Sequence, residues 1–231
     1  MKKILFLSLF LCLVNITETI AQTKSKSKTS ISIQTGYNRG LGIMASFSIH
    51  HLAEGLPGNL RLSIGLNSLD PGNGLEARRI FINNNTNGTL EKKGKSIDFR
   101  ADYMFPANIL NLKNSYWVFG PRYSNFKANF KFVGGNENFD VTTQQWGIGI
   151  GLDNYFKINA KWDISFALGV DYFFDNTLTG HDTSYTPNGD NINPRNNNQN
   201  NNSPFTYLDA DKAINQPQLM PRIMVGLLHK L

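Results

Sequence analysis

The side chains best suited to chemistry in this sequence are few and scattered. His181 is followed by Asp182 and then by Ser184, the residue types that a nucleophilic hydrolase uses. Such catalysis needs a base and a nucleophile held within hydrogen-bonding reach, whereas these residues fall in a polar, Asn-rich segment without rigid support. A lipid or peptide hydrolase stays open as an alternative, and the sequence favours a protein that is not an enzyme.

Metal and cofactor motifs are equally sparse. His50 and His51 are adjacent, so on a strand they would point to opposite faces and could not chelate one metal ion together. The segment from Asp70, Asp-Pro-Gly-Asn-Gly, offers oxygen ligands that suit Ca²⁺, but turn formation explains the same residues. No Gly-rich phosphate loop, CxxC pair or HExxH motif is present. We expect no cofactor, no metal and no catalytic residue.

The N-terminal residues predict export from the cytoplasm. Lys2 and Lys3 precede an apolar run, and a short polar segment after that run ends at Ala21. This is the pattern of a cleaved secretory signal peptide over residues 1–21, which includes the single cysteine. Residues 22–28 would then form a basic polar leader. The net charge is +6, but export from the cytoplasm and the lack of other clustered basic runs argue against nucleic-acid binding.

Most of the remaining chain alternates between apolar and polar residues. From Trp162 to Phe174, the even positions are Trp, Ile, Phe, Leu, Val, Tyr and Phe, with mostly small or acidic residues between them. Side chains on a strand point alternately to two faces, so this pattern predicts a strand with one apolar face. Together with this segment, similar patterns make eight strands, the others lying at about 31–37, 41–50, 60–67, 96–105, 117–133, 139–156 and 219–228.

Two segments depart from simple alternation. Within 117–133, the apolar positions change from odd to even beyond Asn125. A shift of one residue is typical of a β-bulge, which we place near Ser124 and Asn125. The segment from Tyr207 to Ile214 is the one candidate helix.

Alternation alone does not tell which face points inward, so a soluble sandwich and a membrane barrel both fit it. The polar face combines glycines, such as Gly147, Gly149 and Gly151, with charges of both signs. This mixture suits the narrow lumen of an eight-stranded barrel, where opposite charges can pair. The predicted lumen charge network consists of Arg61, Asp98, Arg100, Asp102, Arg122, Asp153, Asp163, Asp171 and Arg222.

Loop lengths and aromatic residues also favour a membrane barrel. Outer-membrane barrels have short periplasmic turns, longer outer loops and aromatic girdles. The periplasmic turns are expected at about 53–58, 106–114 and 157–161, and a long, low-complexity outer loop at about 177–217. The predicted interfacial aromatic residues are Tyr103, Phe105, Trp117, Tyr155, Phe156 and Trp162.

A signal peptide, eight alternating strands and a strand at the extreme C-terminus resemble the small outer-membrane β-barrel proteins of the OmpA/OmpX-like type. The mature start at Gln22 and the Asn-rich loops are similar to members from Bacteroidota, the group that includes PorT-like proteins. The resemblance covers about 29–231. It implies an all-β, eight-stranded, antiparallel up-and-down transmembrane barrel in the cell outer membrane. It also implies a C-terminal signal for the barrel-insertion machinery at Gly226, His229 and Leu231.

These features predict a non-enzymatic barrel with a plugged lumen, embedded in outer-membrane lipid. Its role would be membrane integrity, or binding of a protein partner through the outer loops and a hairpin that projects at about 126–140. A hairpin of this kind offers strand edges for pairing. The alternatives are a PorT-like part in protein secretion, the hydrolase, and a small pore.

Overall fold

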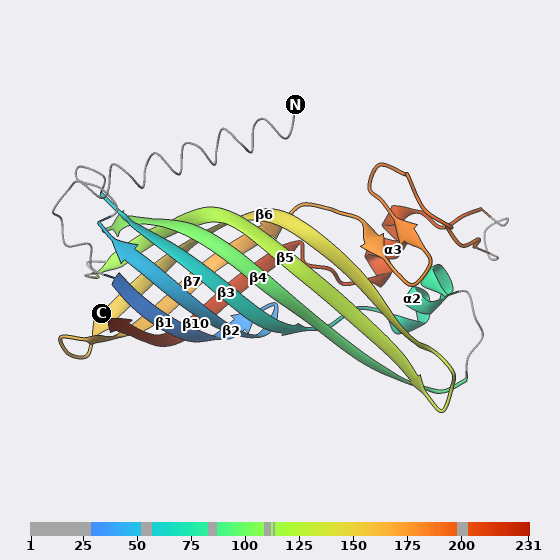
Figure 1. Cartoon of the computed structure of the whole chain (residues 1–231), viewed down its shortest axis with the longest axis horizontal. Coiled ribbons are helices and arrows are strands. Elements are labelled where there is room, and N and C mark those ends of the chain that lie inside the picture. The colour runs from blue at the N-terminus through green and yellow to red at the C-terminus, as the bar shows by residue number, and fades with distance from the viewer. Residues whose placement is uncertain (1–28, 52–56, 83–86, 109–111, 113, 198–202) are drawn as a thin grey trace.

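Eight strands of this chain form a closed antiparallel barrel (Figure 1). The computed structural model describes residues 29–51, 57–82, 87–108, 112, 114–197 and 203–231; the predicted signal peptide and leader lie outside these ranges. Pairing of β10 with β1 closes the ring, which confirms the predicted fold. The barrel strands are β1 (Thr29–Asn38), β2 (Gly40–His50), β3 (Asn59–Leu69), β4 (Thr89–Ala107), β5 (Ser115–Val133), β6 (Asn138–Lys157), β7 (Trp162–Phe173) and β10 (Leu219–Lys230).

The two ends of the barrel differ. The first and last strands meet at one end, where the Leu231 amide donates to the Thr29 carbonyl over 2.9 Å. We call this the terminal end; β2, β4 and β6 also end there (Figure 1). At the opposite, outer end, a single residue, Arg39, joins β1 to β2. The Arg39 guanidinium donates to the carbonyl of Gln216 over 2.8 Å, which ties this turn to the segment before β10.

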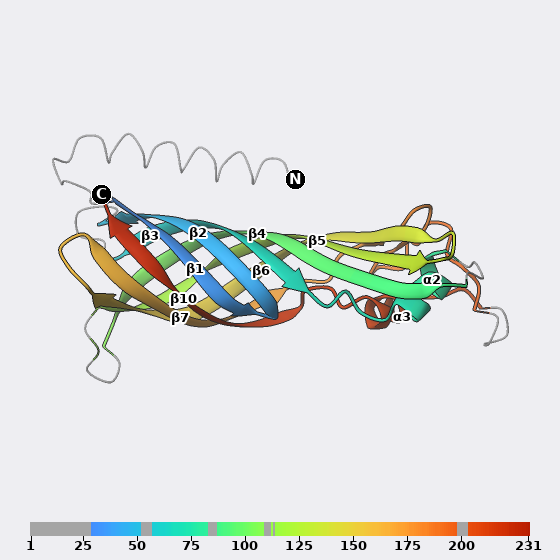
Figure 2. The ribbon, with the colours of Figure 1, turned by 90° about the horizontal axis from the view of Figure 1, so that it is seen from below.

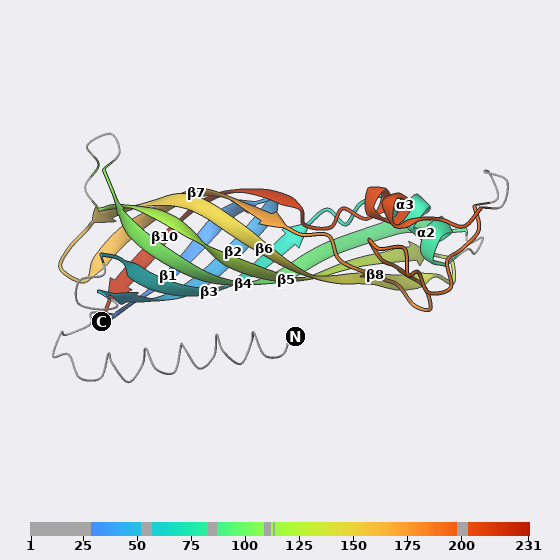
Figure 3. The same ribbon diagram turned by 90° about the horizontal axis from the view of Figure 1, so that it is seen from above.

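β4, β5 and β6 continue far beyond the other strands at the outer end (Figure 1). One face of these projecting strands is covered by α2 (Gly74–Phe81) and α3 (Tyr207–Ala213), and the opposite face is uncovered (Figure 2). Two short strands, β8 (Leu178–Thr179) and β9 (Ser184–Tyr185), extend the sheet beyond β6 (Figure 3). We define the outer extension as residues 70–82, 87–95, 125–145, 174–197 and 203–218.

Both helices begin at capping side chains. The Thr206 hydroxyl and the Asp209 carboxylate form a reciprocal capping box at the start of α3; the predicted helix there is confirmed. α2 was not predicted, although Asn73 accepts hydrogen bonds from the amides of Leu75 and Glu76, a standard N-cap arrangement. Within the described ranges, no helix is both long and apolar enough to cross a membrane.

The interior of the outer extension is apolar. Phe81 of α2 packs edge-on against Tyr185 of β9, with ring centroids 5.4 Å apart. Phe130 of β5 packs against Phe139 of β6 at 5.4 Å. Residues near both ends of the segment at 177–217 are buried in this core, so the segment is anchored at both ends and its low-complexity sequence lies in the middle. Other buried residues of this core include Ile80, Phe126, Phe132, Val141, Leu178, Phe205, Tyr207 and Ile214.

The predicted β-bulge is wrong. Asn125 lies opposite Ile97 on β4 and opposite Gln144 on β6, in the same register as the residues before it. Even-numbered side chains of β5 point inward along most of the strand, from Arg122 in the barrel to Phe126 in the extension. The apolar positions change because the interior changes from polar to apolar at this height, while the strand itself stays in register.

Candidate functional site

The outer wall of the barrel is apolar on all eight strands. Trp146 and Ile150 of β6, for example, leave 57% and 60% of their surface exposed. Soluble monomers rarely expose a continuous apolar surface of this kind, whereas a membrane barrel presents such a band to lipid. The apolar face therefore points outward. Further members of the wall are Ile33, Ile43, Leu62, Leu66, Phe99, Phe119, Ile164, Val170, Ile223 and Val225.

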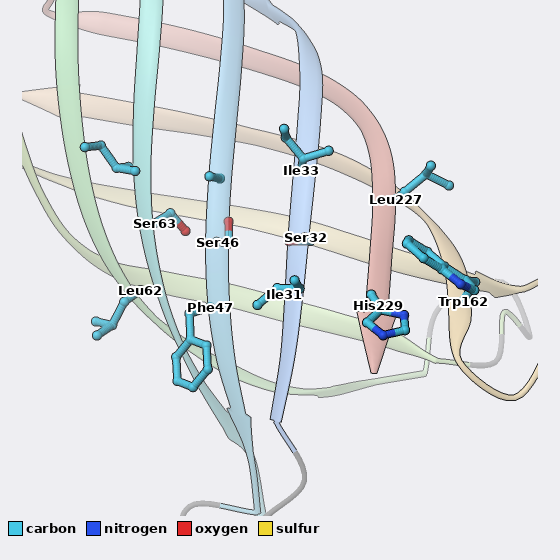
Figure 4. Close-up of a pocket in the computed structure, with 12 residues that line it drawn as sticks. Ile31, Ser32, Ile33, Ser46, Phe47, Leu62, Ser63, Trp162, Leu227 and His229 are labelled. Atoms are coloured by element: carbon cyan, nitrogen blue, oxygen red, sulfur yellow. The ribbon is translucent and has the colours of Figure 1, made fainter. Parts of the chain in front are cut away.

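A shallow depression of about 770 Å³ lies in this wall near the terminal end (Figure 4). It forms because Ala45 of β2 lies opposite two larger residues, Ile33 of β1 and Ile64 of β3. Trp162 and His229 border it, with their rings 4.4 Å apart. Its lining is mainly hydrocarbon, which suits a lipid acyl chain. The other apolar lining residues are Ile31, Phe47, Leu62 and Leu227.

All nine charged residues of the predicted network are buried. Arg61 of β3 contacts Asp102 of β4 at 2.9 Å and also pairs with Asp153 of β6, on the far side of the lumen. Arg122 of β5 contacts the other oxygen of Asp102 at 2.6 Å. Asp163 is separate, because it pairs with Lys230 at the terminal end over 2.7 Å. The remaining four arginines and four aspartates balance in charge.

Asp171 of β7 is the centre of this network. One of its oxygens accepts from Arg122 Nε over 2.8 Å, and the other lies 3.1 Å from Arg100 and 3.8 Å from Arg222. Burial of a charge without a partner is costly, and Asp171 provides counter-charge to three arginines at once. The network joins strands on several sides of the lumen and so fixes the barrel's cross-section.

Polar and apolar layers fill the rest of the lumen. Asp98 accepts from Asn67 over 2.7 Å and from Ser124 over 2.8 Å. Towards the terminal end, an apolar cluster of Met104, Val118, Tyr155 and Leu228 crosses the interior. The apolar core of the outer extension lies above the opposite opening. Eight strands leave an interior just wide enough for side chains, and here those side chains occupy it.

Gly149 of β6 shows how tightly the network is packed. A Cβ atom added there would lie 2.1 Å from Asp171 Oδ1 and 2.5 Å from Arg122 Nε. The absence of a side chain at this position therefore makes room for the ion pair. An inward-facing glycine row was expected from the sequence, and the structure gives its physical reason.

The prediction for one interfacial aromatic residue, Tyr155, is wrong. Its side chain is only 8% exposed, and its hydroxyl lies 3.4 Å from Arg61 Nη1 and 3.3 Å from Asp153. Odd-numbered residues of β6 point inward through the barrel, and Tyr155 continues that alternation. The other predicted girdle residues lie on the outward-facing side near the terminal end: Tyr103, Phe105, Trp117, Phe156 and Trp162.

The three residues of the predicted assembly signal lie on or beside β10. Gly226 approaches β1 so closely that an added Cβ would lie 2.0 Å from the Ile33 carbonyl oxygen. His229 lies opposite Trp162 on β7. Leu231 follows the strand and is exposed. Recognition of this strand by the insertion machinery stays a prediction.

The residues of the hydrolase alternative do not assemble into a catalytic group. Arg195 donates to the Asp182 carboxylate over 2.7 Å, and the Thr183 hydroxyl donates over 3.1 Å. Although desolvation raises it, these hydrogen bonds hold the pKa of Asp182 below its ordinary value. Ser184 is buried in β9, while His181 is exposed. In the part of the chain that the structure covers, no three acidic, His or Cys residues are grouped to hold a metal ion.

Comparison with known proteins supports the fold. No family model and no curated protein matches this chain. Among solved structures, the chain is similar to a major outer membrane protein from Thermus thermophilus, with 20% identity, a TM-score of 0.69, and coverage of 90% of this chain and 100% of that one. It is also similar to the Ail protein of Yersinia pestis, with 12% identity, a TM-score of 0.44, and coverage of 90% and 100%. CarO of Acinetobacter baumannii has 14% identity, a TM-score of 0.41, and coverage of 89% and 97%.

The similarity to the Thermus protein extends over that entire chain. At this level of identity it establishes a shared architecture, the eight-stranded antiparallel barrel, because one fold can serve many functions.

Proposed function

We propose that the chain is a non-enzymatic β-barrel of the cell outer membrane whose lumen is sealed and whose outer extension stands above the membrane surface. The observation that carries this proposal is the inverted distribution of side chains: hydrocarbon on the outer wall, and ion-paired arginine and aspartate inside. Such an arrangement is stable in lipid, where the wall is solvated by acyl chains and the backbone is fully paired within the ring.

Orientation follows from the outer extension. The terminal end would face the periplasm, because outer-membrane barrels have short periplasmic turns and longer outer loops. The depression around Ala45 would then lie in the periplasmic half of the bilayer. The extension would be displayed at the cell surface, where it serves membrane integrity or contact with a protein partner.

The two edges of the projecting sheet leave little room for a partner to add a strand to the hairpin. On one side, β4 runs beyond the last residue of β3, and Lys92 and Lys93 lie on that free edge. Lysines on an edge strand oppose pairing with another chain. On the other side, β8 pairs with β6 at Thr142. A partner would therefore bind the faces of the extension in preference to its edges.

Two measurements test the proposal. The folded protein from the membrane fraction should migrate differently on a gel before and after boiling, and recovery in the osmotic-shock fraction would contradict the assigned location. In planar bilayers the inserted barrel should show no large, stable conductance. A steady open channel would contradict the sealed lumen and favour the small pore. A PorT-like part in secretion stays a prediction of the family resemblance.

A further inference from the structure

The uncovered face of the outer extension carries a group of lysines. Lys93 and Lys95 of β4 and Lys127 and Lys131 of β5 occupy alternate positions that point away from α2 and α3. Figure 2 shows this face of β4 and β5 free of other elements. We call these four residues the lysine face.

The register places two of these lysines side by side. Lys95 lies directly opposite Lys127, and like charges opposite each other destabilise a sheet. Asp140 of β6 compensates Lys127 through a contact of 2.6 Å. Lys93 and Lys95 form no ion pair with any residue that the structure describes. With Glu91 and Asp140 counted against the four lysines, this face keeps an excess of two positive charges.

The Lys95–Lys127 pair lies just above the apolar wall. Ile97 is the next outward residue of β4, two residues below Lys95, which is a distance of about 7 Å along a strand. One outward position lower, opposite Phe99, Tyr123 of β5 contacts Trp146 of β6, with ring centroids 5.1 Å apart. Tyr and Trp prefer the interface between hydrocarbon and headgroups. The two lysines are therefore at the height of the headgroups of the outer leaflet.

We propose that Lys95 and Lys127 bind a phosphate group on a glycolipid of the outer leaflet, with Tyr123 and Trp146 beneath its sugar. This inference rests on the proposed outer-membrane location. A phosphate between the two ammonium groups gives Lys95 the counter-charge that it lacks and adds to the one that Asp140 gives Lys127. The bilayer itself presents a bound lipid to them at the correct height. Lys93 adds positive potential above the site.

The test uses the full mature chain folded in zwitterionic detergent micelles. The probe is a glucosamine-disaccharide lipid that carries two phosphates. The comparison ligand is the same lipid after removal of both phosphates. Binding of each lipid is measured by native mass spectrometry. We expect the phosphorylated lipid to bind more tightly. The double variant Lys95→Gln/Lys127→Gln should raise its Kd about tenfold. The control variant Lys157→Gln/Lys161→Gln removes two exposed lysines at the terminal end and should leave the Kd unchanged.

Each of the following results would overturn the inference: equal binding of the dephosphorylated lipid, an unchanged Kd in the double variant, or an equal loss in the control. If the phosphorylated disaccharide without acyl chains binds the protein as tightly as the intact lipid does, the ligand need not be a lipid, and that part of the inference is contradicted. If the double variant does not fold, the single variant Lys95→Gln, which breaks no ion pair, replaces it and should weaken binding in the same direction. Failure of the wild-type protein to insert into vesicles would contradict the proposed outer-membrane function. Failure of the inserted protein to bind the lipid would contradict only the lysine site, so the two outcomes can be told apart.

Discussion

Arg122 on β5 and Asp171 on β7 form an ion pair of 2.8 Å across the intervening strand β6. The pair passes over Gly149, where no side chain obstructs it. Because Arg122 also contacts Asp102 on β4 at 2.6 Å, one guanidinium ties together three strands that are not all neighbours in the sheet. The interior of this barrel is therefore held by charges that the narrow lumen forces into contact.

Asp171→Asn tests how much that arrangement contributes. The change leaves three buried arginines with one fewer counter-charge, and breaking a buried pair in this way costs about 3–5 kcal/mol of unfolding free energy. Urea unfolding of the barrel in vesicles, followed by tryptophan fluorescence, measures the loss. Asp140→Asn is the matched control, because it breaks an exposed pair with Lys127 and should cost less than about 1 kcal/mol. Equal effects of the two variants would contradict a dominant role for the lumen network.

Gly149→Ala and Gly65→Ala compare two glycines that both point into the lumen. At Gly149 the new methyl group would overlap Asp171 and Arg122, whereas at Gly65 the nearest atom is 3.8 Å away. We expect Gly149→Ala to lower the unfolding free energy by about 1–3 kcal/mol, the usual cost of overpacking. Gly65→Ala should be neutral or slightly stabilising, since alanine restricts the unfolded chain. The same urea titration measures both variants. If Gly149→Ala leaves the unfolding free energy unchanged, the ion-pair network can shift to accommodate the methyl group.

The sequence was sufficient for the barrel because a strand's two faces repeat every second residue, and that period survives without any tertiary information. The outer extension could not be derived in the same way. Phe126 and Phe130 carry an apolar signal identical to that of the lipid-facing residues, yet they point inward, and only the continuous register of β5 reveals it. Tyr155 shows the converse: it is close in sequence to the outward-facing aromatic residue Phe156, but its odd position in β6 turns its side chain inward.

The sequence also could not show which arginine pairs with which aspartate inside the lumen. Alternation placed Arg61 and Asp153 on polar faces, but their meeting across the lumen depends on the shear of the closed ring. The helix α2 could have been found from Asn73 followed three residues later by Glu76, a capping pattern.

Phe81→Ala tests whether the outer extension has a core of its own. Phe81 is fully buried and packs against Tyr185, so its truncation should cost about 3–5 kcal/mol locally. We expect faster protease cleavage in the segment at 174–218 while the barrel keeps its heat-modifiable gel migration. Leu75→Ala, on the same helix but exposed, should leave cleavage unchanged. Loss of heat-modifiability in Phe81→Ala would instead mean that extension and barrel fold as one unit.

Asp70 and Lys92 predict a pH-sensitive contact at the base of the outer extension. Lys92 Nζ donates to Asp70 Oδ1 over 2.8 Å, and the Gly72 amide donates to the same oxygen over 3.0 Å. These two hydrogen bonds, the lysine's first, hold the pKa of Asp70 below its ordinary value of 3.8. Since the folded pKa is the lower one, the stabilisation is fully present above that ordinary value and is lost as the pH falls through the folded pKa.

NMR titration of the Asp70 carboxyl carbon in micelles measures this shift directly. The midpoint should lie below 3.8 in the wild type and rise in Lys92→Gln, because the strongest donor to the carboxylate is removed. Lys93→Gln serves as the control, since Lys93 is the next residue along β4 but its side chain points to the opposite face. A midpoint that moves equally in both variants would indicate a general effect of positive charge, and would exclude the specific hydrogen bond from Lys92 as the cause.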